Sequence, residues 1–278
     1  MKFWKMHGAG NDFIIINNIL EKIDIGKFPY LAEKLCTPRL SLGADGLMVI
    51  EDSDKADFKM LFYNSDGSVG EMCGNGARCI CRYAYENNLS SETQIIETAA
   101  GTVKGERIDK RNYKVRLNDP QEVILNGKAE ISGDVYDYSY VELGNPGLPH
   151  VVVPMKNLKD IDEDFLFNLG KKFRYYKAFP KGANVNFYEI TGEDEIFERT
   201  WERGVEGFTL ACGTGTGSVV AVLSLLNKVS GKNVKVDMRG GTLIIDINIQ
   251  NEKISDIFLT GPTNIVAKGE ITDEDISI

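Results

Sequence analysis

Short apolar runs dominate the hydropathy pattern of the chain, and Gly, Asn and Asp residues bound most of them. Short runs rich in Val, Ile, Phe and Tyr between such residues are typical of strands. We therefore predict strands at residues 12–17, 47–50, 58–63, 93–97, 113–117, 151–153, 184–190, 233–237, 242–249 and 253–259. Helix-like stretches are fewer, and we place them at residues 30–35, 77–88, 162–173 and 216–228. The pattern indicates an α/β protein in which strands predominate.

The two clearest helical stretches each follow a Cys-Gly-x-Gly motif, which begins at Cys73 and again at Cys212. A strand-like run and a Gly-Thr pair come next in both places. Gly101 follows Cys73 by 28 residues, and Gly241 follows Cys212 by 29 residues. This internal repeat predicts two related halves.

Two further features bear on these halves. An Asn-aromatic strand segment precedes each motif, NDF at residues 11–13 and NVNF at residues 184–187, and we interpret the two as equivalent. Residues 117–133 have the weakest pattern in the centre of the chain, and we expect the crossover between the halves there. Related halves often pack about a pseudo-twofold axis. We therefore expect Cys73 and Cys212 to face each other.

Composition excludes several classes of protein. A net charge of −9 argues against a nucleic-acid-binding surface. The sequence has neither a long apolar run nor a signal-peptide pattern at its start, so we expect no membrane span and a cytoplasmic location. Five cysteines with irregular spacing and only two histidines predict free thiols and no metal site.

A cysteine that opens a Gly-rich helix has distinctive chemistry. The positive end of the helix dipole lowers the pKa of a thiol, and the N–H groups of the first turn bind an anion such as a carboxylate. Two such sites predict a carboxylate substrate with a sulfur on each side. This arrangement suits removal of an α-proton by a thiolate and return of a proton by a thiol. Cys36, Cys79 and Cys81 do not open a Gly-x-Gly turn, and we interpret them as small buried hydrophobic residues.

These motifs resemble those of the diaminopimelate epimerase family, enzymes of lysine and cell-wall precursor biosynthesis that work without pyridoxal. The similarity extends almost from end to end. It includes MHGAGNDFIII at residues 6–16, GADGL at 43–47, YNSDGSVGEMCGNGARC at 63–79, ANVNF at 183–187, WERGVEG at 201–207, ACGTGTG at 211–217 and TGP at 260–262.

The resemblance implies a fold of two similar domains, each a barrel-like, mostly antiparallel sheet around a central helix. We expect the first domain at residues 1–118, with the final segment 265–278 returning to it, and the second at residues 119–264. The resemblance further implies an isomerase without cofactor or metal, a homodimer that inverts one α-carbon of the small amino acid L,L-diaminopimelate to give the meso isomer.

The resemblance also implies roles for particular residues. Cys73 and Cys212 would be the catalytic acid and base. The substrate-binding set would be Asn11, Asn64, Gly74, Asn75, Asn184, Glu202, Arg203, Gly213 and Thr214. In this set Asn11 would position the reacting carbon. The amides of Asn64 and Asn184, together with Arg203, would bind the distal carboxylate, and Glu202 would bind the distal ammonium.

Two departures from the family pattern keep the substrate open. The family commonly has Gly-Asn-Pro-His where this chain has GNPGLPH at residues 144–150, so that either Asn145 or Leu148 takes the place of the family asparagine. Phe208 stands where a smaller or polar residue is usual. These departures favour an alternative, a racemase or epimerase of another amino acid such as histidine or a thioether bis-amino acid like lanthionine. A non-catalytic amino-acid-binding protein is disfavoured because both cysteines are present.

Overall fold

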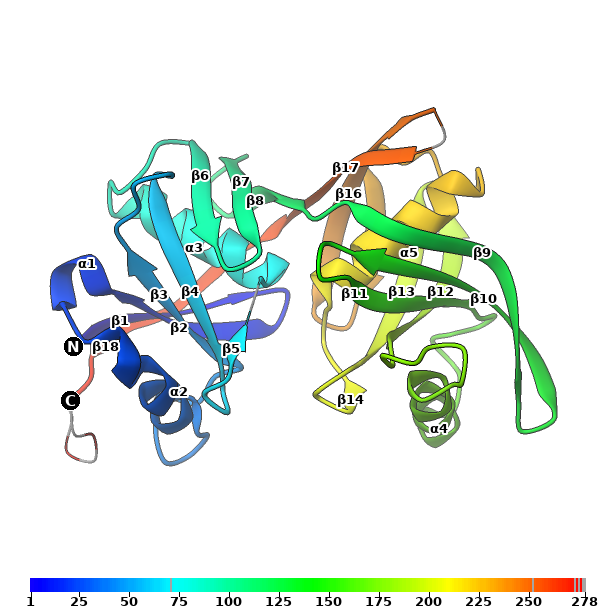
Figure 1. Cartoon of the computed structure of the whole chain (residues 1–278), viewed down its shortest axis with the longest axis horizontal. Helices are drawn as coiled ribbons and strands as arrows, with labels where there is room; N and C mark the ends of the chain where they lie inside the picture. Colours follow the sequence, from blue (N-terminus) through cyan, green and yellow to red (C-terminus); the bar gives the residue numbers. More distant parts are fainter. Residues whose placement is uncertain (71, 252, 273, 275, 277–278) are drawn as a thin grey trace. The chain divides into compact units, whose positions relative to one another are not determined.

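The computed structural model describes residues 1–70, 72–251, 253–272, 274 and 276. These residues form two compact units, Met1–Val115 with Gly261–Ile278, and Arg116–Thr260 (Figure 1). The sequence placed the corresponding boundaries after residues 118 and 264. Glu71, in the stretch 63–79 that resembles the family, and residues 273, 275, 277 and 278 of the expected returning segment lie outside the described residues.

The sheet of the first unit has the strand order β18-β1-β2-β3-β4-β6-β7-β8, with the short β5 added to β4. Neighbouring strands are antiparallel except in the β2–β3 and β4–β6 pairs. The strands are β1 Lys2–Gly8, β2 Asn11–Asn17, β3 Gly46–Glu51, β4 Phe58–Asn64, β5 Val69–Gly70, β6 Thr93–Thr98, β7 Gly101–Arg107, β8 Asn112–Leu117 and β18 Asn264–Glu270.

The second unit repeats this order as β9-β10-β11-β12-β13-β15-β16-β17, with β14 added to β13. Its parallel pairs, β11–β12 and β13–β15, occupy the same places. The strands are β9 Pro120–Ile131, β10 Asp134–Leu143, β11 Leu148–Pro154, β12 Asn184–Gly192, β13 Glu195–Glu202, β14 Gly207–Phe208, β15 Val234–Met238, β16 Gly241–Gln250 and β17 Lys253–Pro262. The expected fold class, mixed α/β with two similar halves, is confirmed.

This correspondence corrects one detail of the predicted repeat. Asn11 begins β2, the first strand of its parallel pair, whereas Asn184 begins β12, the second strand of its pair. Position for position, β12 corresponds to β3 and β13 to β4, so the NDF and NVNF segments are not equivalent. The resemblance between them is local, because both combine an asparagine at a strand start with an apolar continuation.

Each unit has one central helix and one outer helix. The central helices are α3 (Gly74–Glu86) and α5 (Gly213–Leu225), and both are buried on nearly every side, as expected for a helix enclosed by its own sheet. The outer helices α2 (Phe28–Cys36) and α4 (Glu163–Arg174) cover the opposite sheet faces (Figure 1). The remaining turns are α1 (Asn18–Glu21) and the 3₁₀ turn η1 (Ile25–Lys27). Among the described residues, no helix is both long and apolar enough for a membrane span.

The expected crossover at residues 117–133 begins next to the boundary between the two units, which lies between Val115 and Arg116, and its residues Pro120–Ile131 form the long strand β9 of the second unit. Among the described residues this strand pairs only with β10, and alternate residues such as Ile124 and Lys128 are exposed. An edge strand with one face in solvent has a weaker hydrophobic pattern than a central strand. Asn126, which adopts a positive φ of 58°, lies where the pairing register between β9 and β10 shifts.

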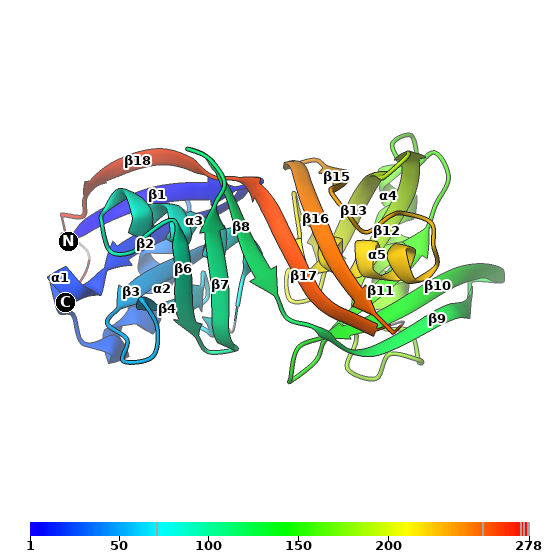
Figure 2. The ribbon, with the colours of Figure 1, turned by 90° about the horizontal axis from the view of Figure 1, so that it is seen from above.

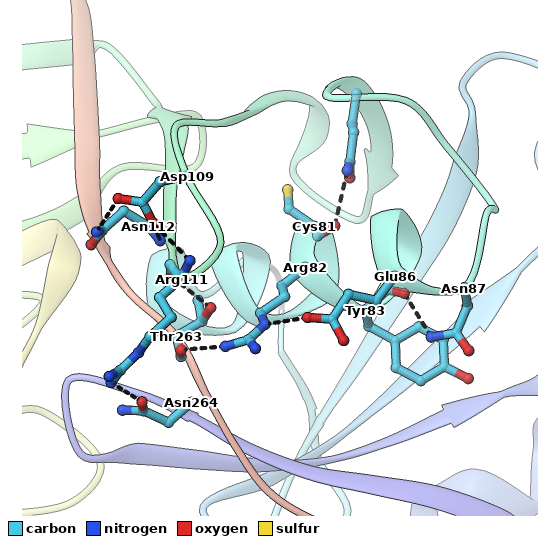
Figure 3. Close-up of polar contacts among 11 residues, drawn as sticks. Cys81, Arg82, Tyr83, Glu86, Asn87, Asp109, Arg111, Asn112, Thr263 and Asn264 are labelled. Atoms are coloured by element: carbon cyan, nitrogen blue, oxygen red, sulfur yellow. Dashed lines mark hydrogen bonds and ion pairs between the residues drawn. The ribbon is translucent and has the colours of Figure 1, made fainter.

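The end of the chain returns to the first unit, where β18 runs antiparallel to β1 (Figure 2). A polar cluster ties this return to the central helix (Figure 3). Arg82 of α3 donates to the carbonyl oxygen of Thr263 at 2.7 Å and pairs with Glu86 at 2.8 Å. Thr263 in turn donates its N–H and its hydroxyl to the carbonyl of Arg111, each at 2.8 Å. The side chain of Arg82 therefore joins α3 to a segment that is 181 residues away in the sequence.

We expect the substitution Arg82→Met to lower the free energy of unfolding by about 3 kcal/mol, because it leaves the buried Thr263 carbonyl and Glu86 without their charged donor. Urea denaturation followed by circular dichroism measures this loss. Lys59→Met removes the more exposed ion pair between Lys59 and Glu97 and should cost less than about 1 kcal/mol. Equal losses for the two variants would contradict the role given to Arg82.

Candidate active site

Each catalytic candidate is the residue that caps the N-terminus of a central helix. Cys73 precedes α3 with φ −131° and ψ 116°, and Cys212 precedes α5 with φ −124° and ψ 104°. The nearly identical backbone shows that the two cysteines hold equivalent positions in the two units. Neither helix start has a capping side-chain hydrogen bond. Because the N–H groups of a first helical turn have no carbonyl of a preceding turn to bond, both starts are suited to receive an anion.

Both helices begin three residues before the predicted starts at residues 77 and 216, so the glycines lie inside the helices. Close packing on the sheet explains them. A Cβ on Gly76 would meet the terminal methyl group of Met48, and a Cβ on Gly215 would meet Oδ1 of Asn186. These two glycines therefore let the first turn of each helix lie close to side chains of its own sheet, which would have to shift to admit an alanine.

In the first unit, three of the predicted site residues, Cys73, Asn11 and Asn75, lie in contact with one another. The Cys73 thiol donates to Oδ1 of Asn11 at 3.4 Å, and Nδ2 of Asn75 lies at 3.4 Å from the same oxygen. Nδ2 of Asn11 donates to Asp45 at 2.6 Å, and this bond fixes the orientation of the Asn11 amide. Asn11 is thus held between the turn that carries Asp45 and the start of α3.

Arg78 lies next to this cluster and donates hydrogen bonds to it. The sequence alone did not identify this residue as part of the site. Its fully buried guanidinium donates to Oδ1 of Asn75 at 3.0 Å and to the carbonyl oxygen of Gly74 at 3.3 Å. Burial lowers the pKa of Arg78 to about 10, which still leaves the group charged at neutral pH. The sequence does place an arginine on the side of the predicted helix that faces the sheet. Only the burial identifies it as a cation placed next to Cys73.

Asn64 lies at the end of β4, separated from β2 by the strand β3. Its Nδ2 donates to Oγ of Ser68 at 2.9 Å. Asn64 corresponds to Glu202 of the second unit, because each ends the strand that pairs with the short strand before its cysteine. The two predicted distal-binding residues therefore occupy equivalent places in the repeat.

In the second unit, Cys212 is 7% exposed, and its sulfur lies 3.5 Å from Oγ1 of Thr214. Burial raises the pKa of the Cys212 thiol well above its ordinary value, and the carboxylate of Glu202 raises it further. The hydroxyl of Thr214 and the N–H of Gly215 lower this pKa, but each has a smaller effect than burial or Glu202. The expectation that the helix start lowers the thiol pKa is therefore wrong for Cys212, because desolvation outweighs the helix dipole.

Glu202 and Arg203 form the end of β13 and are half-buried. The N–H of Arg203 donates to Oδ1 of Asn184 at 2.9 Å, and its guanidinium donates to the carbonyl oxygen of Lys181 at 3.2 Å. Asn184 is buried, and its Nδ2 donates to the carbonyl oxygen of Pro149 at 3.1 Å. Asn184 thus holds the backbone of Arg203 in place.

The two departures from the family pattern have clear places in the structure. Phe208 lies opposite Trp201, and its ring packs with Phe167 and Phe187 in the core beneath α4, on the sheet face away from Cys212. Leu148 begins β11 as Asn11 begins β2, and each starts two residues before the first residue paired with the parallel neighbour. Asn145 lies in the exposed turn between β10 and β11.

His150 is fully buried, and Nδ2 of Asn186 lies 3.3 Å from its Nδ1. Burial lowers the pKa of His150 to about 3, so the ring is neutral at physiological pH. A neutral ring enclosed by the sheet supports a structural role for this histidine.

Both the sequence and the fold of the chain are similar to those of known proteins. The sequence matches the family described as diaminopimelate epimerase over residues 3–123 and 143–266. It is 39% identical to the diaminopimelate epimerase of Aquifex aeolicus, with 99% of both chains covered, and 38% identical to that of Methanococcus maripaludis, with 98% of this chain and 99% of the relative covered. Among solved structures, the fold resembles a PhzF-family protein of Bacillus anthracis (TM-score 0.75, 17% identity, 98% of both chains) and a hydroxyproline epimerase of Agrobacterium vitis (TM-score 0.71, 15% identity, 98% of this chain and 90% of the other).

Proposed function

The chain belongs to the diaminopimelate epimerase family, and from this we propose that it inverts one α-carbon of L,L-diaminopimelate to give the meso isomer, without a cofactor. The observation that carries the proposal is the pair of cysteines at equivalent helix starts in two equivalent units. An isomerase that removes and returns a proton at one carbon needs two proton-transfer groups of similar kind, and a duplicated unit supplies them.

In the proposed mechanism Cys73 and Cys212 act on opposite faces of the α-carbon. The thiolate of Cys73 takes the α-proton, and the thiol of Cys212 delivers its own proton to the other face, so that the carbon is inverted and each sulfur has exchanged its protonation state. The raised pKa of Cys212 makes it the member that holds the proton. In the reverse direction the two groups exchange roles.

The carboxylate next to the reacting carbon gains negative charge as the α-proton leaves. The N–H groups at the two helix starts, in Gly74-Asn75 and Gly213-Thr214, are the groups that would bind it and stabilise this charge. In its thiol form Cys73 donates to Oδ1 of Asn11, and this contact holds the sulfur in place before it loses its proton to become the base.

The distal end of diaminopimelate is a second amino acid group with an ammonium and a carboxylate. Arg203 is suited to the carboxylate and Glu202 to the ammonium, with the amide of Asn64 as a further partner. Asn184 would contribute through Arg203, whose N–H it accepts at 2.9 Å.

A second candidate is inversion of another amino acid on the same scaffold, such as histidine or lanthionine. Leu148, at the position that corresponds to Asn11, is the feature that favours it. Phe208 no longer supports it, because its ring packs in the core beneath α4. For the assembly and location we propose a cytoplasmic homodimer, and light scattering after gel filtration tests the dimer.

Proton exchange in heavy water tests the function. We expect the protein to introduce deuterium at the α-carbon of L,L-diaminopimelate and to produce the meso isomer, as measured by proton NMR and chiral chromatography. Histidine and lanthionine serve as the competing substrates under the same conditions. Exchange of histidine or lanthionine without exchange of L,L-diaminopimelate would replace the leading assignment with the second candidate.

A further inference from the structure

A fully buried carboxyl group lies beneath the helix start that carries Cys212. Glu198 belongs to β13, is 0% exposed, and points to the sheet face covered by α5. Its Oε2 lies 2.9 Å from Oγ1 of Thr216 in the first turns of α5, and its Oε1 lies 3.2 Å from Oγ1 of Thr200 on its own strand. Among the described residues, no lysine, arginine or histidine forms an ion pair with Glu198. A carboxylate buried in this way, with only hydroxyl partners, is costly.

The two hydroxyls are shared with further acceptors. Thr216 Oγ1 also lies 2.9 Å from the carbonyl oxygen of Cys212, and Thr200 Oγ1 lies 3.2 Å from Oδ1 of Asn186. Ionised Glu198 leaves two hydroxyl hydrogens for these four short contacts, so two of the contacts join oxygens with no hydrogen between them. A proton on Glu198 raises the number of satisfied contacts to three. In that state the carboxyl donates to Thr216, and Thr216 donates to the Cys212 carbonyl. Oγ1 of Thr216 is also 3.4 Å from the sulfur of Met238, which is a weaker acceptor.

From this geometry we propose that Glu198 is held as a neutral acid and, through Thr216, positions the peptide of Cys212, so that loss of its proton disturbs the start of α5 and places a negative charge near the Cys212 sulfur. Glu198 is thus a positioning residue for one of the two cysteines. The role of Glu198 in catalysis rests on the proposed function. Its neutral state and its contact with Thr216 do not depend on which substrate the protein binds.

The surrounding titratable groups are consistent with this role. Burial raises the pKa of Glu198 to about 8, against which the two threonine hydroxyls act only in part. Glu202 is the other acid that acts on Cys212. His150, which reaches the cluster through Asn186, is neutral, and Tyr188, paired with Glu198 across the strands, has its pKa raised by burial. Glu198 is therefore the group of this cluster whose charge changes near pH 8.

Direct observation of the carboxyl needs no substitution. In protein labelled with carbon-13 at the glutamate carboxyls, we expect one resonance at pH 7 with the chemical shift of a protonated acid, which titrates near pH 8. Full ionisation of every glutamate resonance below pH 6 would overturn the proposal. Glu198→Gln assigns the signal, because the resonance should disappear from its spectrum.

The reactivity of Cys212 tests the coupling. Iodoacetamide labelling across pH 7 to 10, followed by peptide mass spectrometry, reports the thiolate fraction of Cys212 separately from the other cysteines. Ionisation of Glu198 in the unmodified protein slows the labelling of Cys212 at high pH. We therefore expect the ratio of the labelling rate above pH 9 to the rate at pH 7 to be about threefold larger in Glu198→Gln than in the unmodified protein. Glu195→Gln, an exposed position on the same strand, should follow the unmodified protein. Identical pH profiles for the two variants would overturn the proposal.

The contact to the helix start has its own pair of variants. Thr216→Val removes the hydroxyl, and we expect kcat for diaminopimelate to fall about tenfold with a smaller change in KM. Thr216→Ser keeps the hydroxyl and should restore kcat to within about threefold. No difference between Ser and Val would overturn the positioning role. The NMR and labelling experiments use no substrate, so they separate a failure of this inference from a failure of the proposed function, which appears as absence of exchange in the unmodified enzyme.

Discussion

Replacement of Cys73 or Cys212 by alanine should lower the rate of stereoinversion at least about a thousandfold, because each variant lacks one of the two groups that move the proton. A carbon can lose its proton to one sulfur and regain it from the same side, but inversion requires a donor on the other face. The double variant should be no slower than either single variant, since residues that act as a unit are not additive. Initial rates of meso-diaminopimelate formation, measured by chiral chromatography, give the comparison.

Cys36 offers the matched control for these variants. It is free, 1% exposed and the last residue of α2, and burial raises its pKa to about 12. Cys36→Ala should keep kcat/KM within about twofold and cost about 1 kcal/mol of stability. A Cys73→Ala or Cys212→Ala variant that still inverts diaminopimelate at a tenth of the original rate would contradict the two-cysteine mechanism.

The sequence was most informative where chemistry and local structure share the same residues. The Cys-Gly-x-Gly motifs identified both helix starts, and the similar spacing to Gly101 and Gly241 indicated the repeat that the strand order confirms. Glycines in helices disfavour a helix by propensity, however, and this is why the predicted starts came three residues late. Packing against Met48 and Asn186 favours the glycines there, and packing partners lie far away in the sequence.

The parts of the site that sequence reasoning missed are those defined by which face of a strand or helix is buried. Arg78 reads as a solvated residue in a helix until the sheet encloses it, and Glu198 reads as one acid among many charged residues of a strand. Phe208 shows the converse, because its departure from the family pattern suggested a changed pocket, whereas its ring lies in the core beneath α4. Alternation along a short, irregular strand such as β14 is too brief to assign a face.

The two units share one fold but differ in the buried ionisable group near each cysteine. A cationic guanidinium lies under the start of α3, and Gly217 occupies the corresponding helix position in α5. Glu198 lies under the start of α5, at the strand position that Met60 occupies in the first unit. A nearby cation favours a thiolate, whereas a buried acid favours a thiol only once it has lost its own proton. The duplicated scaffold thus provides different electrostatic surroundings for two otherwise equivalent sulfurs.

Substitution of Arg203 by methionine should raise KM for L,L-diaminopimelate about a hundredfold with a smaller change in kcat. The guanidinium is the cation proposed for the distal carboxylate, and its removal leaves that carboxylate without a charged partner at a cost of about 3 kcal/mol. The distal group does not change during inversion, so its contact contributes equally to ground and transition states and affects mainly KM. The methionine side chain preserves much of the packing, and the N–H that Asn184 accepts remains in the backbone.

Arg239→Met is the matched control, because Arg239 is an exposed arginine of the same unit that pairs with Glu163, the first residue of α4. It should leave KM within about twofold. Steady-state kinetics with diaminopimelate and with histidine separates the two candidate functions: a substrate without a distal carboxylate has no charge for Arg203 to bind. A KM for diaminopimelate that is unchanged in Arg203→Met, with the protein folded and active, would remove Arg203 from the distal site and leave the second carboxylate of the substrate without its assigned partner.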